Sequence, residues 1–282
     1  MRMARVETVD GLRPYRIAGT VALPLEFEDA SVPADVVDGF RRFGSLSNWR
    51  LRAEDSSRAI SVDSCSFGRP IASPGQVIGV GLNYVLHAAD LAARIPERPV
   101  IFFKGRHTII GHGERLFLPS ASQRVTAEAE LGLIIGTPAF EVSVSDALDY
   151  VGGVCCVLDM TAEDILQEDP RMLTLSKNYT GFFAYGPEVA SLGHLIGAAG
   201  SLESVEVATY LNGQCVRRAT VGQMRFSPAE LLSFISHVLP LMPGDIISTG
   251  TPGAVVLASG DLAECRITGL GHLTTPVAAV GS

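Results

Sequence analysis

The chain has 282 residues, of which 47% are hydrophobic and 18% are charged, a composition that permits a large core. Its formal net charge of -8 excludes the basic footprint expected of a protein that binds nucleic acid or an anionic membrane. There is no run of about 18 uncharged apolar residues and no apolar signal-peptide core near the start, so we expect a cytoplasmic protein. Five cysteines without C-x-x-C spacing are typical of reduced core thiols.

Residues 1–70 form the first predicted unit. A turn with glycine in residues 6–21 predicts a strand pair, and residues 33–54 predict a short helix with a connector. From residue 71 onward, short apolar runs alternate with Gly, Pro and Asp, a pattern typical of many strands joined by loops. We therefore predict an α+β, strand-rich chain with a small N-terminal domain at 1–70 and a catalytic or binding domain at 71–282.

Residues 79–94 predict a strand, a turn and then a helix that carries His87 and Asp90 on one face. A histidine oriented by a carboxylate is the arrangement of a general base, because the carboxylate fixes the tautomer and stabilises the imidazolium. Two ordinary interpretations stay open. Asp90 and Arg94 have the spacing of a surface ion pair, and a single histidine can be structural.

Two lysines stand where they could meet an anionic substrate group. Lys104 ends an apolar strand pattern, and Lys177 precedes an aromatic stretch that ends in Gly-Pro. For each of them the alternative is a structural lysine whose aliphatic stem lies along apolar surface.

A strand pattern in residues 126–136 carries Glu128 and Glu130 on one face, opposite an apolar face. Side chains two residues apart lie roughly 6.5–7 Å apart at Cα, close enough for both carboxylates to lean toward one point. A cation between them would remove their repulsion. The competing explanations are one neutral carboxyl with a raised pKa and a solvated strand face.

Asp159 ends the next apolar run and is a plausible third ligand to the same ion. Three carboxylates without His or Cys favour a hard cation, Mg²⁺, Mn²⁺ or Ca²⁺, over zinc. Thr161 and Asp164 have the spacing of a capping box, so Asp159 could instead be a carboxylate near a helix start that interacts with the helix dipole.

Two further patterns complete the second half of the chain. Residues 227–241 predict an amphipathic helix with a capping box of Ser227 and Glu230. A strand after Asp245 leads into Thr249, Gly250 and Thr251, a tight loop whose hydroxyls and exposed backbone N–H groups could hold a carboxylate. A simple turn is the ordinary interpretation.

In their order, segments over roughly residues 74–280 resemble the fumarylacetoacetate hydrolase family. The resemblance implies a mixed β-roll catalytic domain, a homodimer, and Mg²⁺ or a similar ion held by an E-x-E pair and a following Asp. The segments are "GLNYVLHAAD", "FFKGRHTIIGHGERLFLP", "AEAELGLIIG", "LDMTAEDIL", "SKNYTGFFAYGP", "LNGQ", "PGDIISTGTP" and "GDLAECRITGLGHL".

The family's functional positions can be matched one at a time. Glu128, Glu130 and Asp159 match the metal ligands, and His87 matches the base on a mobile lid. Asp90 stands where Glu is usual. Lys177 matches the lysine near the substrate carboxylate or oxyanion, and Thr251 matches the threonine of the T-G-T-P turn. The chain departs from the family at Leu158 for Asn, Glu163 for Arg, and Thr180 for the acidic residue after the lysine.

Together these features predict hydrolytic carbon–carbon cleavage of an acylpyruvate-like 2-oxo acid or 1,3-dicarbonyl compound. The ion would polarise the substrate, His87 would take a proton from water, and Lys177 with the loop at Thr249–Thr251 would hold the carboxylate or oxyanion. Decarboxylation or tautomerisation of a 2-oxo dicarboxylic acid through the same enolate is the alternative. A non-catalytic metal-binding protein is another. A nucleophilic hydrolase is disfavoured, because the chain has no G-x-S-x-G.

Overall fold

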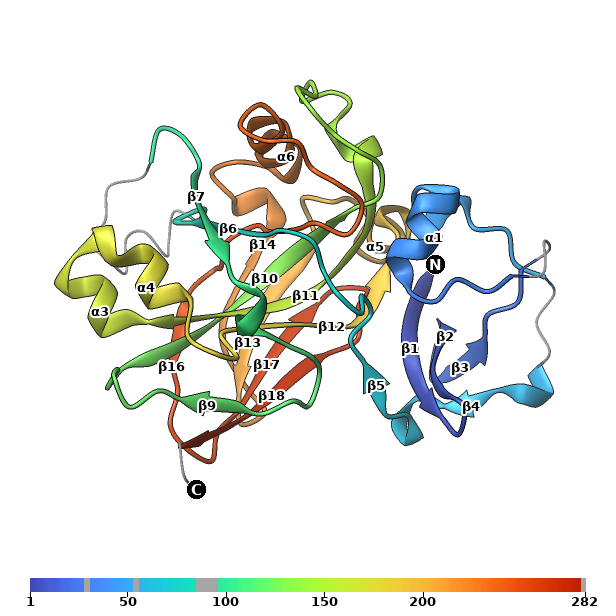
Figure 1. Ribbon diagram of the computed structural model, residues 1–282, viewed down its shortest axis with the longest axis horizontal. Coiled ribbons are helices and arrows are strands. Elements are labelled where there is room, and N and C mark those ends of the chain that lie inside the picture. Colours follow the sequence, from blue (N-terminus) through green and yellow to red (C-terminus); the bar gives the residue numbers. More distant parts are fainter. Residues whose placement is uncertain (28–30, 53–55, 85–95, 280–282) are drawn as a thin grey trace.

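A computed structural model describes residues 1–27, 31–52, 56–84 and 96–279, and it has two β-sheets with short helices around them (Figure 1). The predicted strand-rich α+β class is confirmed. Among the described residues no helix is long and apolar enough to span a membrane. The helices are α1 (Val36–Phe43), α3 (Glu163–Glu168), α4 (Leu173–Lys177), α5 (Leu192–Ala199) and α6 (Pro228–Ser236), with 3-10 helices η1 (Leu46–Asn48), η2 (Ser56–Arg58), η3 (Val62–Ser64), η4 (Arg106–Thr108), η5 (Ala147–Tyr150), η6 (Pro170–Met172) and η7 (Val221–Gln223).

The larger sheet has 13 strands within the described ranges. Its main path runs β4-β3-β2-β1-β12-β11-β10-β15-β6-β7, while β16 pairs with β10, β5 with β1 and β8 with β12. The strands are β1 (Arg2–Thr8), β2 (Gly11–Ala18), β3 (Val21–Pro24), β4 (Ile60–Ser61), β5 (Phe67–Gly68), β6 (Val77–Gly81), β7 (Val100–Lys104), β8 (Ile109–Ile110), β10 (Val125–Ile135), β11 (Val151–Ala162), β12 (Phe183–Ala190), β15 (Ile246–Ser248) and β16 (Ala254–Val256).

The smaller sheet packs on one face of the central strands and encloses the main core. On that face β10 contributes Ala129 and Leu131, which are buried in one cluster with Val207, Cys265 and Leu273 of the smaller sheet. The alternation of β10 therefore points one set of side chains into this core and the other set, which includes the glutamates, to the opposite face. The strand order is β14-β13-β17-β18-β9, with β9 (Leu116–Leu118), β13 (Glu206–Leu211), β14 (Gln214–Thr220), β17 (Leu262–Ile267) and β18 (Leu273–Ala279).

The N-terminal segment belongs to the larger sheet. β1 pairs with β12 through Arg2–Ala190, Met3–Val189 and Ala4–Glu188, so β1 to β4 extend the sheet that carries the central strands. In Figure 1 these blue strands lie to one side of β10, β11 and β12, and α3 and α4 lie at the other side. Backbone pairing between β1 and β12 joins the segments before and after residue 70 in one sheet. The predicted domain boundary near residue 70 therefore stays a prediction.

The strand β10 changes partners along one edge. It pairs with β15 at Gly132–Ile134 and with β16 at Thr126–Glu128. Between these two ladders the chain leaves the sheet over residues 249–253, opposite Glu130. The T-G-T-P loop thus fills an interruption in the pairing beside this glutamate.

The local predictions had mixed outcomes. The strand pair β1–β2, the helix α1 and the capping box of Ser227 and Glu230 on α6 are confirmed. The capping box at Thr161 and Asp164 is wrong, because β11 continues to Ala162 by pairing with β10, and α3 starts at Glu163. The predicted helix that carries His87 and Asp90 falls within residues 85–95, outside the described residues.

The cysteines are all free thiols. Cys155, Cys156 and Cys265 are buried, as predicted for core thiols. Cys215 is exposed and Cys65 is half-buried, so the prediction of a core position is wrong for these two.

Candidate active site

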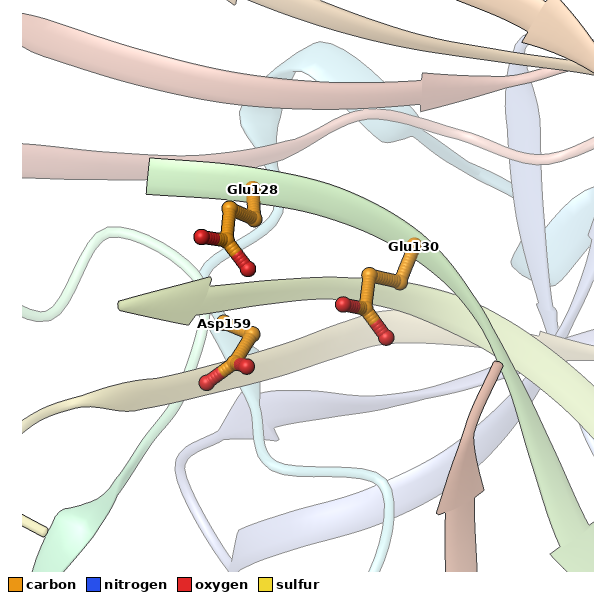
Figure 2. A group of neighbouring side chains, drawn as sticks. All are labelled: Glu128, Glu130 and Asp159. Atoms are coloured by element: carbon orange, nitrogen blue, oxygen red, sulfur yellow. The ribbon is translucent and has the colours of Figure 1, made fainter. Parts of the chain in front are cut away.

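Three carboxylates meet on the face of the larger sheet that points away from the smaller one. Glu128 and Glu130 come from β10 and Asp159 from β11, and all three side chains point toward one another (Figure 2). Glu128 and Asp159 are directly opposite in the β10–β11 ladder. Each of the three residues offers one oxygen, and these oxygens lie within 4.8 Å of one another. All three residues are buried, so the interpretation as a solvated strand face is wrong.

Two lysines compensate part of this negative charge. The Lys177 ammonium, at the end of α4, donates to Glu128 Oε2 at 2.9 Å and to Asp159 Oδ2 at 2.6 Å. Lys104 Nζ, at the end of β7, lies 2.5 Å from Asp159 Oδ1. It also donates to the carbonyls of Met160, at 3.0 Å, and Lys177, at 2.6 Å. Two of its donors are therefore directed at protein carbonyls and its charge lies beside Asp159, and its predicted contact with substrate stays a prediction.

Glu130 has neutral hydrogen-bond donors instead. Its Oε2 accepts from Ser248 Oγ at 2.5 Å and from the Gly250 backbone N–H at 2.8 Å. Glu128 has one comparable neutral donor, Thr161 Oγ1, at 3.0 Å from its Oε1. The two glutamates of the E-x-E pair thus differ in the charge that faces them.

The surroundings shift the pKa values in opposite directions. Burial and, after it, the charge of Asp159 raise the pKa of Glu130 to about 8, against the opposing effect of Lys177. Burial lowers the pKa of Lys104 to about 8, although Asp159 counteracts this. Burial alone would also lower the pKa of Lys177, but the charges of Asp159, Glu128 and Glu130 raise it above its ordinary value. Lys177 therefore stays an ammonium ion at neutral pH.

The donor set fits a hard divalent cation. Three carboxylates face two ammonium groups, so one negative charge is left over when all three are ionised. Within the described part of the chain the cluster contains only carboxylate ligands, which Mg²⁺, Mn²⁺ and Ca²⁺ prefer over softer donors. Glu128, Glu130 and Asp159 are the residues that would hold such an ion.

The loop after β15 differs from its prediction in one respect. Its backbone N–H groups were expected to be exposed, but Thr249, Gly250 and Thr251 are buried. Thr249 Oγ1 donates to the Leu131 carbonyl at 2.8 Å, and Gly250 donates to Glu130. The loop does hold a carboxylate, but that carboxylate belongs to the protein. A contact of this loop with substrate stays a prediction.

Two departures from the family pattern lie in different surroundings. Glu163 is buried at the start of α3 and accepts from Arg124 Nε at 2.5 Å. Thr180 is exposed. The negative charge at position 163 is therefore paired, while position 180 offers no buried acidic group.

Sequence reasoning missed two hydroxyls that hold the glutamates. Thr161 lies two residues after Asp159 on the same strand face, so the alternation of β11 could have indicated it. Ser248 stands at the end of β15, and only the pairing of β15 with β10 brings it to Glu130.

The fold and the buried carboxylate cluster define a class of protein, that of strand-rich mixed-sheet proteins with three buried acidic side chains that could hold a metal ion. The chain belongs to the fumarylacetoacetate hydrolase family, because residues 76–278 match the model of the fumarylacetoacetate (FAA) hydrolase C-terminal domain.

Relatives and solved structures agree with this assignment. A fumarylacetoacetate hydrolase domain-containing protein 2 homolog from Dictyostelium discoideum is 32% identical over 88% of this chain and 87% of its own length. A mitochondrial oxaloacetate tautomerase from Xenopus laevis is 29% identical over 98% of this chain and 90% of its own. The structure of a fumarylacetoacetate hydrolase from psychrophilic Exiguobacterium antarcticum superposes with a TM-score of 0.81 at 25% identity, over 99% of each chain.

Proposed function

We propose that this protein is a divalent-metal-dependent hydrolase that cleaves a carbon–carbon bond in a small acylpyruvate-like substrate, a 2-oxo acid or 1,3-dicarbonyl compound. The observation that carries the proposal is the Lys177 ammonium at 2.9 Å from Glu128 and 2.6 Å from Asp159. It sets a permanent positive charge beside three buried carboxylates suited to a cation. A homodimer in the cytoplasm, acting without nucleic acid or membrane, completes the proposal.

The chemistry divides among the residues as follows. Mg²⁺ or Mn²⁺ bound by Glu128, Glu130 and Asp159 would supply Lewis acidity toward the substrate oxygens. Lys177 Nζ keeps its proton because its pKa is raised, so it can donate a hydrogen bond to the negative oxygen that develops during cleavage. His87 would take the proton from water and Asp90 would orient its ring, in the roles that the family resemblance assigns to them.

Keto–enol tautomerisation is the second candidate, and one observation favours it. The Xenopus laevis relative, which matches 98% of this chain, is an oxaloacetate tautomerase. This reaction needs groups that stabilise an enolate, such as Lys177, but no water-activating base. Decarboxylation of oxaloacetate shares the same requirement.

Turnover of a substrate panel separates these reactions. Several acylpyruvates and oxaloacetate are incubated with Mg²⁺, with Mn²⁺ and with EDTA, and enol absorbance, product acids and carbon dioxide are followed. We expect metal-dependent release of pyruvate and a free acid from an acylpyruvate. Enol–keto interconversion without cleavage would instead establish the tautomerase, and carbon dioxide from oxaloacetate alone would establish a decarboxylase.

A ligand substitution distinguishes an enzyme from a non-catalytic metal-binding protein. We expect Glu128→Gln to reduce kcat/KM by about 100-fold or more, since changes around a metal ligand commonly cost 10–100-fold, while the protein still folds because Lys177 keeps Asp159 as its partner. Glu264→Gln is the matched control, because Glu264 is also a buried strand glutamate held by a cation, with Arg266 Nη2 at 2.7 Å. Wild-type protein that binds Mn²⁺ but turns over none of the panel would contradict the proposed reaction.

A further inference from the structure

One peptide unit links the carboxylate cluster to a neighbouring turn. The Gly250 N–H donates to Glu130 Oε2 at 2.8 Å. At the other end of the same peptide unit, the Thr249 carbonyl accepts from Asn83 Nδ2 at 2.8 Å. Asn83, the peptide group and Glu130 therefore form a continuous chain of hydrogen bonds. Such chains strengthen each bond by mutual polarisation.

Both polar atoms of the Asn83 side chain, Nδ2 and Oδ1, make hydrogen bonds that hold this arrangement. Besides Thr249, its Nδ2 donates to the Phe226 carbonyl at 3.0 Å, and its Oδ1 accepts from the Phe226 N–H at 2.9 Å. Its backbone carbonyl accepts from the Arg225 N–H at 2.7 Å. The residue is 1% exposed, so water does not replace these bonds. Asn83 thereby joins three segments that are distant in sequence.

The backbone around Asn83 has the conformation that this contact requires. Leu82 has φ of +54°, a left-handed value that is uncommon for a bulky residue and lies directly before Asn83. Gly250 has φ of +96°, and a Cβ there would lie 2.7 Å from Asn83 Cβ. The two turns are therefore in direct contact, and Gly250 leaves no space for a side chain between them.

The sheet explains why a cross-link is needed at this place. β6 and β15 run parallel, with Gly79 opposite Ser248, so both chains leave the sheet at the same end. Beyond Ser248 the ladder between β6 and β15 stops, and the peptide that holds Glu130 lies past this point. The Asn83 amide continues the connection where backbone pairing has ended.

We infer that Asn83 is a positioning residue for the metal site, which acts on the Glu130 carboxylate through the Thr249–Gly250 peptide. It touches neither the ion nor the substrate. This inference rests on the proposed function only in requiring that Glu128, Glu130 and Asp159 hold a divalent cation. It extends the site to the turn that directly precedes residues 85–95.

The test measures ion affinity apart from catalysis. Mn²⁺ binding to the full chain is followed by isothermal titration calorimetry for wild type, Asn83→Ala and Ser236→Ala. Ser236 is the matched control, a fully buried side chain whose Oγ accepts from the Val142 N–H at 3.0 Å and donates to the Ser233 carbonyl at 2.8 Å. We expect Asn83→Ala to raise the Mn²⁺ dissociation constant by about 10-fold or more, as loss of an outer partner of a metal ligand does.

Melting temperatures separate positioning from general loss of stability. We expect Ser236→Ala to lower the melting temperature while its Mn²⁺ dissociation constant stays within about twofold of wild type. If Asn83→Ala does not give folded protein, Asn83→Ser takes its place, because its shorter hydroxyl cannot reach both carbonyls. Folded Asn83→Ala or Asn83→Ser with wild-type affinity for Mn²⁺ would overturn the inference, as would equal losses of affinity in the control.

The two proposals fail in different ways. Wild-type protein that binds Mn²⁺ without turning over any 2-oxo acid removes the proposed reaction and leaves the comparison of Asn83 with Ser236 fully informative. Wild-type protein that does not bind Mn²⁺ overturns the inference about Asn83 as well, because no ion is then positioned.

Discussion

The carboxylate cluster has two ends with different surroundings. At the lysine end, Asp159 and Glu128 are paired with the ammonium groups of Lys104 and Lys177. At the loop end, the hydrogen bonds that Glu130 receives from the described residues come from neutral donors, Ser248 and Gly250. The buried charge at the lysine end is thus compensated by direct ion pairs, whereas the carboxylate at the loop end accepts hydrogen bonds from neutral donors and interacts with the charge of Lys177 without a direct ion pair.

This difference indicates what each end contributes. The lysine end has the features of a preformed structural unit, because buried charges are stable when they are paired and hydrogen-bonded. The loop end retains the electrostatic demand for a cation, which the raised pKa of Glu130 reports. Stability should therefore depend most on the lysine end, and the response to added ions should depend most on the loop end.

The largest expected effect comes from breaking the lysine end. Asp159→Ala leaves the ammonium groups of Lys104 and Lys177 buried without their shared carboxylate. Removing one partner of a buried pair is strongly destabilising, so we expect the free energy of unfolding to fall by about 3–5 kcal/mol. Chemical denaturation in EDTA measures this.

An exposed ion pair provides the control for this prediction. Asp169→Ala removes the partner of the exposed Arg171 and one capping hydrogen bond from the Arg171 N–H, and it should lower the denaturation midpoint far less than Asp159→Ala, since surface pairs and single caps contribute little. A midpoint for Asp159→Ala close to that of Asp169→Ala would show that the lysine end is not the stabilising unit.

A second expected effect is a pH-dependent response to ions at the loop end. The folded pKa of Glu130, about 8, lies above its ordinary value of 4.5. The stability that its neutral form contributes is therefore fully present below pH 4.5 and is lost as pH rises through about 8. A bound cation replaces that proton, so the increase in melting temperature on adding Mg²⁺ should grow from pH 5 to pH 9.

Glu130→Gln tests the assignment of this response. The variant has no titrating group at position 130, so its response to Mg²⁺ should be small and flat with pH. The same rising response in Glu130→Gln would assign the pH dependence to another group and would remove the contrast between the two ends.

The smallest expected effects come from single hydroxyl groups. Ser248→Ala removes one donor from Glu130, and Thr161→Ala removes one from Glu128. Because Lys177 still compensates Glu128, we expect Thr161→Ala to change the Mn²⁺ dissociation constant by about twofold and Ser248→Ala to raise it by roughly 10-fold. Calorimetric titration of both variants measures the difference. Equal effects would mean that the neutral donors matter alike at both ends.

Local pattern predicted that the three carboxylates lie together because its signal is short-range. Alternation along residues 126–136 places Glu128 and Glu130 on one face, and the second apolar run ends near Asp159. The strand-rich class follows from the same alternation. The buried position of the carboxylates needed the rest of the molecule, since α4 and β7 cover this face only after folding.

The partners of the carboxylates were not predictable from local pattern. Lys177 is 49 residues from Glu128 in sequence and 18 from Asp159, so both lysines could be interpreted only as substrate contacts or as structural residues. At Thr161 a local capping signal was overridden by the ladder with β10, where Thr126 pairs with Thr161 and Val125 with Ala162. Tertiary pairing outweighed local preference at this point.

The interruption between β15 and β16 has a consequence for sequence length. The two ladders keep β10 in register on either side of Glu130, so the intervening residues 249–253 are constrained at both ends. A one-residue insertion there would leave both ladders intact but would carry the Gly250 N–H away from the carboxylate. Loop length at this position is therefore a direct criterion, readable from sequence, for whether a chain of this kind keeps the Gly250 hydrogen bond to Glu130 and, with it, the proposed ion site.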